Sequence, residues 1–380
     1  MASSTKKETD WILIAAVILL ASFGLIMIYS ASYVIGFDRH NGDYLYFFKK
    51  QLQWIVISSV FFIFFMMFPY RLYQKLVFPI VLVSFISLGL VLTPLGYEVK
   101  GATRWINLGF TNLQPSEFVK LWMIIYLAHV YSRKQTYINQ FVRGVLPPLI
   151  IIVGIFALIM AQPDLGTASL ILAVAGLMVF CSGAKMFHLI SLASISGFVV
   201  WTYAKSEVYR MNRITGFMDP FADETGTGYQ LIQSYIAMAH GGVSGAGFGQ
   251  SVQKLFYLPE AHTDFILSIV AEELGMLGVL FVFLCLGTIV FRGIVIGTRA
   301  STPFGSLLAF GISFQIALQI CLNVGAMSGV LPITGIPLPF MSYGGSSLMI
   351  TAISLGILAN IARSSRKKTE ENSVELTKVS

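Results

Sequence analysis

The sequence predicts an all-α polytopic membrane protein with about ten transmembrane helices and a large outer loop between spans seven and eight. Of the 380 residues, 56% are hydrophobic and only 11% are charged, whereas a soluble domain carries about 25% charged residues. Apolar runs long enough to cross a bilayer recur along the chain. The net charge of +7 comes from basic residues that fall mostly at the ends of these runs, which argues against nucleic acid as a partner.

A spanning helix needs about 20 mostly apolar residues. Ten runs fit: 11–33, 51–68, 72–92, 116–132, 144–161, 165–182, 186–204, 264–291, 304–328 and 344–362. The first run is longer than the ~7–15 residues of a signal-peptide core, which indicates a retained span. We therefore expect one ten-span domain over residues 1–362. The polar, charged segment 363–380 is expected to be a disordered cytoplasmic tail.

Basic residues in the short connections predict the orientation. With the N-terminus inside, five lie in short outer loops: Arg39, Lys49, Lys50, Lys100 and Arg104. Fifteen lie in inner segments: Lys6, Lys7, Arg71, Lys75, Arg133, Lys134, Arg143, Lys185, Arg292, Arg299, Arg363, Arg366, Lys367, Lys368 and Lys378. This bias predicts that both termini are cytoplasmic.

Three outer connections are too elaborate to be simple loops. Residues 93–115 hold GATRWINLGFTNLQP, and the loop 205–263 holds aromatic residues throughout, for which we expect short helices on the membrane surface. The segment 330–347 holds three prolines and two adjacent glycines. Such irregular backbone persists at membrane depth only where it is buried in protein or lines a wet cavity.

The first candidate site is Asp264, at the junction of the long outer loop and an apolar run. Ionisable residues at such a position are functional candidates. On a helix that starts there, Ser268, Ala271 and Gly275 share its face, and their small side chains would leave room for something to approach. The alternative is that Thr263 or Asp264 only caps the helix. The nearby Glu260 and His262 favour a functional role, because a cap needs no titratable neighbours.

A second candidate is the pair Glu117 and Lys120, which lie three residues apart at the start of the fourth apolar run. They can pair on one helix face. A lone lysine facing lipid would be costly, so Lys120 is expected to face inward. The pair is either a structural ion pair or a contact for an anionic or polar substrate. Arg104 adds a cation in the preceding outer loop.

Two further motifs are interpreted as turns. Residues 162–166 (QPDLG) are consistent with turn chemistry at a helix start. Residues 241–250 (GGVSGAGFGQ) lack the Gly-Lys-Ser/Thr of a phosphate-binding loop, so we interpret them as a flexible turn. The three cysteines and five histidines have no metal-ligand spacing, and no metal site is predicted.

Taken together, these motifs resemble the SEDS family (shape, elongation, division and sporulation), which comprises FtsW, RodA and SpoVE. The resemblance rests on MIYSAS (27–32), GATRWINLG (101–109), QPSE (114–117), QPDLGTA (162–168), RITGFMDP (213–220), GYQLIQS (228–234), LPEAHTDF (258–265) and PFMSYGGSS (339–347). It spans nearly the whole chain. LPEAHTDF and the short tail are more similar to FtsW and SpoVE than to RodA.

The resemblance implies a ten-span peptidoglycan glycosyltransferase of the bacterial plasma membrane. Its substrate would be lipid II, a disaccharide-pentapeptide on undecaprenyl pyrophosphate. Its partners would be a class B penicillin-binding protein, which crosslinks the glycan, and other division proteins. The family's essential aspartate matches Asp264. Arg104, Glu117, Lys120 and Arg213 match polar residues of the family's central cavity.

The residues themselves are compatible with that chemistry. Glycosyl transfer needs a base for the acceptor hydroxyl, and a carboxylate at the membrane edge can reach the headgroup of a lipid-linked sugar. Basic residues, or a divalent cation such as Mg²⁺ or Mn²⁺, would stabilise a departing pyrophosphate. Two other functions stay open: a flippase or transporter for the same lipid, which intramembrane charges and a broken outer loop would suit, and a non-enzymatic scaffold for a cell-wall synthase.

Overall fold

The computed structural model describes residues 9–99, 102–107, 109, 112–135, 138–205 and 208–379, with the side chains of the last helix described as far as Ser365. In this part of the chain, ten long helical stretches correspond to the ten predicted spans. They are α1 (Trp11–Arg39), α2 (Tyr46–Met67), α3 (Val77–Val91), α4 (Pro115–Lys134), α5 (Leu146–Met160), α6 (Leu165–Cys181), α7 (Met186–Lys205), α10 (Ile266–Thr298), α11 (Pro303–Met327) and α12 (Gly345–Val379).

Six of these stretches are long and apolar enough to cross a membrane by length and composition: α1, α2, α5 together with the preceding single-turn π-helix η3 (Phe141–Val145), α10, α11 and α12 up to Ser365. The shorter α3 and α6 are equally apolar. The remaining two of the ten predicted spans are α4 and α7. Helix α4 carries the buried Glu117 and Lys120. The prediction of an all-α polytopic membrane protein is confirmed.

Several helix ends follow from local sequence. The side chain of Asp10 accepts a hydrogen bond from the amide of Leu13 and so caps α1, and Asp164 and Thr302 cap α6 and α11 in the same way. Such caps satisfy amides that have no partner inside the helix. Pro303 is in the first turn of α11, where its missing N–H costs nothing.

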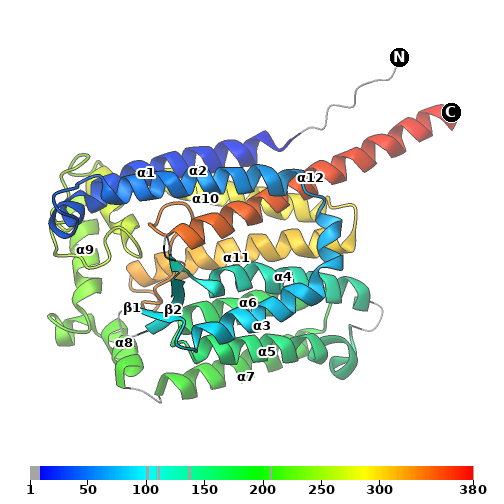
Figure 1. Cartoon of the computed structure of the whole chain (residues 1–380), viewed down its shortest axis with the longest axis horizontal. Coiled ribbons are helices and arrows are strands. Elements are labelled where there is room, and N and C mark those ends of the chain that lie inside the picture. The colour runs from blue at the N-terminus through cyan, green and yellow to red at the C-terminus, as the bar shows by residue number, and fades with distance from the viewer. Residues whose placement is uncertain are drawn as a thin grey trace.

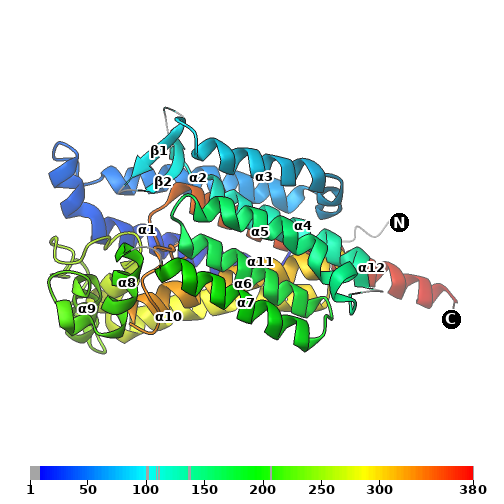
Figure 2. The ribbon, with the colours of Figure 1, turned by 90° about the horizontal axis from the view of Figure 1, so that it is seen from below.

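The start of α1 and the end of α12 lie at one end of the bundle, and the elaborate connections lie at the other (Figure 1; Figure 2). The corner between α2 and α3 is the short 3₁₀ helix η1 (Tyr70–Lys75). Helix α12 continues past the bundle to Val379 (Figure 1), so the tail predicted to be disordered from residue 363 is helical here. The division into domains stays a prediction.

The connection 93–115 folds into a small antiparallel sheet, which the sequence did not predict. Strands β1 (Gly96–Val99), β2 (Ala102–Asn107) and β3 (Asn112–Leu113) pair in that order, with Tyr97 opposite Trp105 and Ile106 opposite Leu113. The sheet packs on the ends of α3 and α4. Its central strand, β2, carries Arg104 and lies toward the end of the bundle opposite the end of α12 (Figure 2).

The long connection 205–263 contains two helices, α8 (Val208–Met218) and α9 (Tyr229–Gly241), separated by the 3₁₀ turn η4 (Pro220–Asp223). This confirms the expected short helices, and their position on the membrane surface stays a prediction. Helix α9 packs against α10, so this connection is held to the bundle rather than projecting from it. The core lies among α4, α6, α10, α11 and α12, whereas α2 exposes most of its apolar residues.

Candidate functional site

Asp264 ends an irregular loop and precedes α10 rather than belonging to it. The helix begins at Ile266, and its N-cap is Phe265, which has no side-chain capping bond. The prediction of a helix starting at Asp264, and the alternative that Thr263 or Asp264 caps it, are therefore both wrong. Asp264 is half-buried, and its Oδ2 would lie 3.6 Å from a Cβ added at Gly335. Its carboxylate therefore faces the 330–347 connection.

Polar side chains hold this backbone in place. Asn323 of α11 donates from Nδ2 to the carbonyl of Asp264 at 2.8 Å and to that of Ile336 at 2.9 Å. The hydroxyl of Ser342 donates to the carbonyl of Thr263 at 2.6 Å. These bonds join the Asp264 loop to the 330–347 connection, which is irregular and largely buried, as predicted.

Glu260 and His262 belong to the same loop as Asp264. Glu260 adopts a positive φ of 57°, which is rare for a residue other than glycine and is often found at functional sites. Its Oε2 accepts from the hydroxyl of Thr263 at 2.8 Å. The ring of His262 packs against Phe47 and Tyr343, with centroids 4.7 and 5.8 Å away. The pKa of Tyr343 is raised to about 12, mainly because the phenol is buried and to a lesser extent because of the nearby Tyr46. This phenol therefore stays neutral.

Glu117 and Lys120 form the predicted inward-facing ion pair. Nζ of Lys120 lies 2.8 Å from Oε1 of Glu117, and each residue is only 3% exposed. Lys120 lines a small cavity between α4, α6 and α11, which Gln315 also lines. Among the described residues, none donates a hydrogen bond to Oε2 of Glu117. Gln315 precedes Asn323 by eight residues, which is about 12 Å along α11, so this pair lies about two turns deeper than Asp264.

Arg104 is engaged with the turn between α5 and α6. Its Nε donates to the carbonyl of Gln162 at 3.4 Å, and its Nη2 donates to the carbonyl of Pro163. Its Nη1 lies 3.7 Å from Oδ1 of Asp164, which caps α6 through the amide of Thr167. The turn chemistry predicted for residues 162–166 is confirmed. Arg213 lies in α8, and its side chain is outside the described part of the structure.

The small-residue face beneath Asp264 is approached closely by another helix. The hydroxyls of Ser268 and Ser234 lie 2.8 Å apart, which brings α9 onto this face. A Cβ added at Gly241 of α9 would lie 1.8 Å from the carbonyl oxygen of Ala271. Small side chains allow two helices to approach closely, and here α9 occupies the space. The expectation that these small residues leave room for an approach is confirmed, and the element that approaches is α9.

Gly275, on the same face, is a break inside α10. It has φ 63° and ψ −159°, and a Cβ there would lie 2.4 Å from the amide nitrogen of Gly245 and the carbonyl oxygen of Val243. The glycine-rich turn 241–250 packs into this break. Its amides at Ala246 and Gly247 donate to the carbonyls of Glu272 and Glu273 at 2.9 and 3.0 Å, so it is a packed turn rather than a flexible one.

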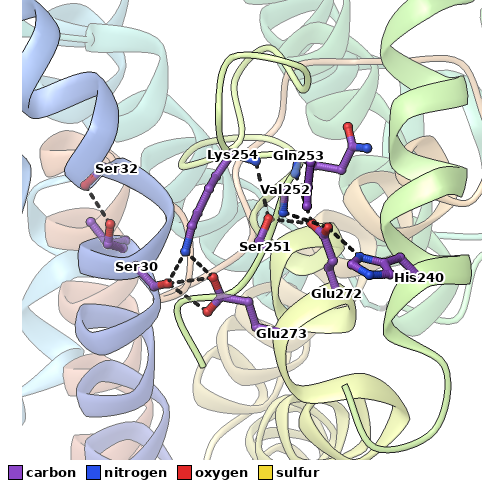
Figure 3. A network of polar contacts seen from close by, with 10 residues as sticks. Ser30, Ser32, His240, Ser251, Val252, Gln253, Lys254, Glu272 and Glu273 are labelled. Atoms are coloured by element: carbon purple, nitrogen blue, oxygen red, sulfur yellow. Dashed lines mark hydrogen bonds and ion pairs between the residues drawn. The ribbon is translucent and has the colours of Figure 1, made fainter. Parts of the chain in front are cut away.

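A polar cluster that the sequence pattern did not predict lies near the end of α1 and the start of α10 (Figure 3). Glu272 accepts from the hydroxyl of Ser251, from the amides of Val252 and Gln253 at 2.9 and 3.4 Å, and contacts Nδ1 of His240 at 3.0 Å. The neighbouring Glu273 lies 2.6 Å from Nζ of Lys254.

Both glutamates are held by partners from other segments of the chain. Adjacent acids in an apolar run signal that buried partners exist. The local pattern does not identify those partners, because they are distant in the sequence. Lys254 precedes Glu273 by 19 residues, and Ser30 precedes it by 243 residues.

Comparisons with known proteins agree with this arrangement. The model of the cell cycle protein family FtsW, RodA and SpoVE matches residues 10–367. The probable peptidoglycan glycosyltransferase FtsW of Bacillus subtilis is 42% identical over 96% of this chain and 94% of the relative. Stage V sporulation protein E of the same organism is also 42% identical, over 96% of this chain and 100% of the relative.

Solved structures share the fold. A chain from a peptidoglycan synthase complex, studied for the coordination of polymerization and crosslinking, has a TM-score of 0.77 at 26% identity and covers 94% of this chain and 98% of its own. The rod shape determining protein RodA of Thermus thermophilus has a TM-score of 0.69 at 23% identity, with coverage of 93% and 97%. The match over residues 10–367, together with these relatives, shows that the chain is a multi-pass membrane protein that belongs to the FtsW, RodA and SpoVE family.

Proposed function

We propose that this protein is a peptidoglycan glycosyltransferase that polymerises lipid II into glycan strands during cell division or sporulation. The names of its FtsW and SpoVE relatives support the activity and its setting. The observation that carries the proposal is Asp264, a half-buried carboxylate at the outer end of the bundle. Its backbone is fixed by α11 and by the 330–347 connection.

The reaction needs one base. The oxygen of the acceptor hydroxyl forms a bond to the anomeric carbon of the donor, and the bond from that carbon to the pyrophosphate oxygen breaks. Asp264 takes the hydroxyl proton, and the pyrophosphate leaves with the bonding electrons. Such a base contributes about 10²–10⁴-fold. Glu272 and Glu273 are unsuited to this role, because both are fully buried and held by hydrogen bonds or an ion pair.

We assign substrate contacts to Arg104, Glu117, Lys120, Arg213, Glu260 and His262. Glu260 and His262 share the loop of Asp264, and Arg104 lies at the same end of the bundle. Among the described residues, no group of three His, Cys, Asp or Glu could hold a metal ion. A requirement for Mg²⁺ or Mn²⁺ is a proposal through which no step is derived.

The partner and the orientation are also proposals. We place a class B penicillin-binding protein beside this chain as the crosslinking enzyme, with other division proteins and without nucleic acid. The similar structure of a peptidoglycan synthase complex supports such an assembly. The protein is placed in the bacterial plasma membrane with both termini cytoplasmic and residues 205–263 outside, which the excess of basic residues in the inner segments supports.

Replacing Asp264 by Asn tests the activity. Asp264→Asn keeps the shape of the side chain but removes its ability to accept the proton. The purified wild type with its penicillin-binding partner should convert lipid II to glycan polymer, and Asp264→Asn should lose at least about 10²-fold in rate while it folds and binds the partner. Asp43→Asn is the matched control, because Asp43 is an exposed carboxylate of the α1–α2 connection. Polymer made by Asp264→Asn at the wild-type rate would remove Asp264 from the mechanism.

A flippase for lipid II is the second candidate, favoured by the buried Glu117–Lys120 pair in the middle of the bundle. A flippase moves the lipid without consuming it and would not need Asp264. Transport of labelled lipid II into vesicles, equal in the wild type and Asp264→Asn and without polymer, would favour this function. A scaffold would neither move nor consume the lipid.

A further inference from the structure

A fully buried ion pair joins three segments of the chain near the proposed catalytic loop (Figure 3). Lys254 of the long outer connection is 1% exposed, and Glu273 of α10 is 0% exposed. Their Nζ and Oε1 atoms lie 2.6 Å apart. The hydroxyl of Ser30 in α1 lies 2.7 Å from both carboxylate oxygens and 3.1 Å from Nζ. The ammonium also lies 5.0 Å from the ring centroid of Tyr33.

Burial of this pair gives little net stability by itself. The free energy lost when two charges are removed from water is about as large as the free energy gained from their attraction. Apolar side chains of similar volume therefore often stabilise a protein interior equally well. What an ion pair adds is directionality, because the ammonium and carboxylate must meet in one geometry with their remaining hydrogen bonds satisfied. Here that geometry fixes the position of Lys254 relative to α1 and α10.

The fixed segment leads directly to Asp264. Glu272, next to Glu273, accepts from the amides of Val252 and Gln253. The amide of Leu258 then donates to the carbonyl of Gln253 at 2.8 Å. Leu258, Ala261 and Phe265 are buried along the rest of the segment. The loop from Ser251 to Asp264 is thus attached to α10 at both ends, by the two glutamates at one end and by the chain itself at the other.

We propose that Ser30, Lys254 and Glu273 form a positioning clamp that sets the orientation of the Asp264 loop for glycosyl transfer. The three residues touch neither substrate nor reacting atoms and act through the loop. The inference rests on the proposed function, since it assigns a role in the same reaction. A displacement of about 1 Å in a catalytic group can cost on the order of 10²-fold in rate, so a loosened clamp should lower kcat more than it raises KM.

Two serines of α1 provide a matched comparison. Ser30 and Ser32 are both buried, at 2% and 1% exposure, but the hydroxyl of Ser32 donates to the carbonyl of Ile28 in its own helix. Ser30→Ala should therefore lower kcat for lipid II polymerisation by roughly tenfold or more, with KM within about threefold. Ser32→Ala should keep both constants. Hydrogen exchange at the amides of residues 251–264 should speed up in Ser30→Ala alone.

The charged residues are tested as a pair, because a single substitution leaves a buried charge without its partner and can prevent folding. Lys254→Met with Glu273→Gln removes both charges at similar volume. The control is Arg292→Met with Asp10→Asn, which removes another α1–α10 ion pair at the opposite end of these helices, where Nε lies 3.1 Å from Oδ2. When equal amounts of folded protein are compared, the clamp double variant should have a lower kcat than the wild type. The control double variant should have the kcat of the wild type.

Three outcomes overturn the clamp. They are wild-type kcat in Ser30→Ala and in the folded clamp double variant, equal kcat losses in both double variants, or unchanged hydrogen exchange in residues 251–264. If the clamp double variant does not fold, the kcat and the hydrogen-exchange rates of Ser30→Ala decide whether the clamp exists. Asp264→Asn is assayed alongside: full activity in that variant means that the proposed base has failed, whereas its inactivity together with normal Ser30→Ala kinetics means that only the clamp has failed.

Discussion

Replacing Lys120 by Met should strongly destabilise the protein. Nζ of Lys120 lies 2.8 Å from Oε1 of Glu117, and both side chains are almost fully buried. Lys120→Met leaves the carboxylate of Glu117 in the interior without its cation, and no described residue donates to the second oxygen, Oε2. Removing one partner of a buried pair costs about 3–5 kcal/mol, which corresponds to roughly 10²- to 10³-fold or more in the folding equilibrium.

Thermal unfolding in detergent measures this effect against an exposed pair. Nζ of Lys49 lies 3.0 Å from Oδ2 of Asp43, with side chains 56% and 38% exposed. Such surface pairs contribute about 0–1 kcal/mol, so Lys49→Met should change the unfolding temperature little. Lys120→Met combined with Glu117→Gln removes both charges and should recover most of the lost stability. Equal unfolding temperatures for Lys120→Met and Lys49→Met would refute the reasoning from burial.

The double variant also separates the two roles of the pair. If Lys120 contacts the anionic headgroup of lipid II, the stable double variant stays deficient in polymer synthesis. If the pair is only structural, the double variant regains the activity of the wild type. Lys134→Ala serves as the lysine control for activity, because Lys134 lies at the end of α4 and donates to the carbonyl of Arg143.

Three further predictions follow from the orientation and the close packing. Cysteine placed at Gly226, in the long outer connection, should react with an impermeant thiol reagent added outside intact cells; labelling only after access from the inner side would reverse the orientation. Gly241→Ala should destabilise by about 1–3 kcal/mol or more, because its Cβ would meet the backbone of Ala271, whereas Gly287→Ala in α10 meets nothing within 4 Å and should be neutral or stabilising in thermal unfolding. Gly275→Ala should lower the unfolding temperature for two reasons, its φ of 63° and its contact with Gly245; a wild-type value would contradict the break in α10.

The spans were predictable because each apolar run carries its own signal. Trp11 to Tyr29, for example, is long and apolar enough to indicate a membrane helix without reference to any other segment. The inward pairing of Glu117 and Lys120 was predictable for a similar reason, since residues three apart on a helix are neighbours and lipid penalises an unpaired charge.

The rest of the site depends on contacts between distant segments. The sequence around Ser268 and Ala271 does not predict that α9 packs against the helix face that they share. The sequence around Lys254 does not predict that Glu273 and Ser30 are its partners. The start of α10 was placed two residues early for a related reason. Asp264 is a good capping residue, but its carbonyl bonds to Asn323 of α11 in a turn, so a tertiary contact outweighed the local preference.

The different surroundings of the outer carboxylates explain why the base is assigned to Asp264. Glu272 receives two backbone amides and a serine hydroxyl, and Glu273 receives an ammonium and a hydroxyl. Both glutamates are also sealed from solvent. Asp264 is half-buried, so of these three it is the carboxylate that a sugar hydroxyl can reach, and the two glutamates are better suited to holding the loop that carries it.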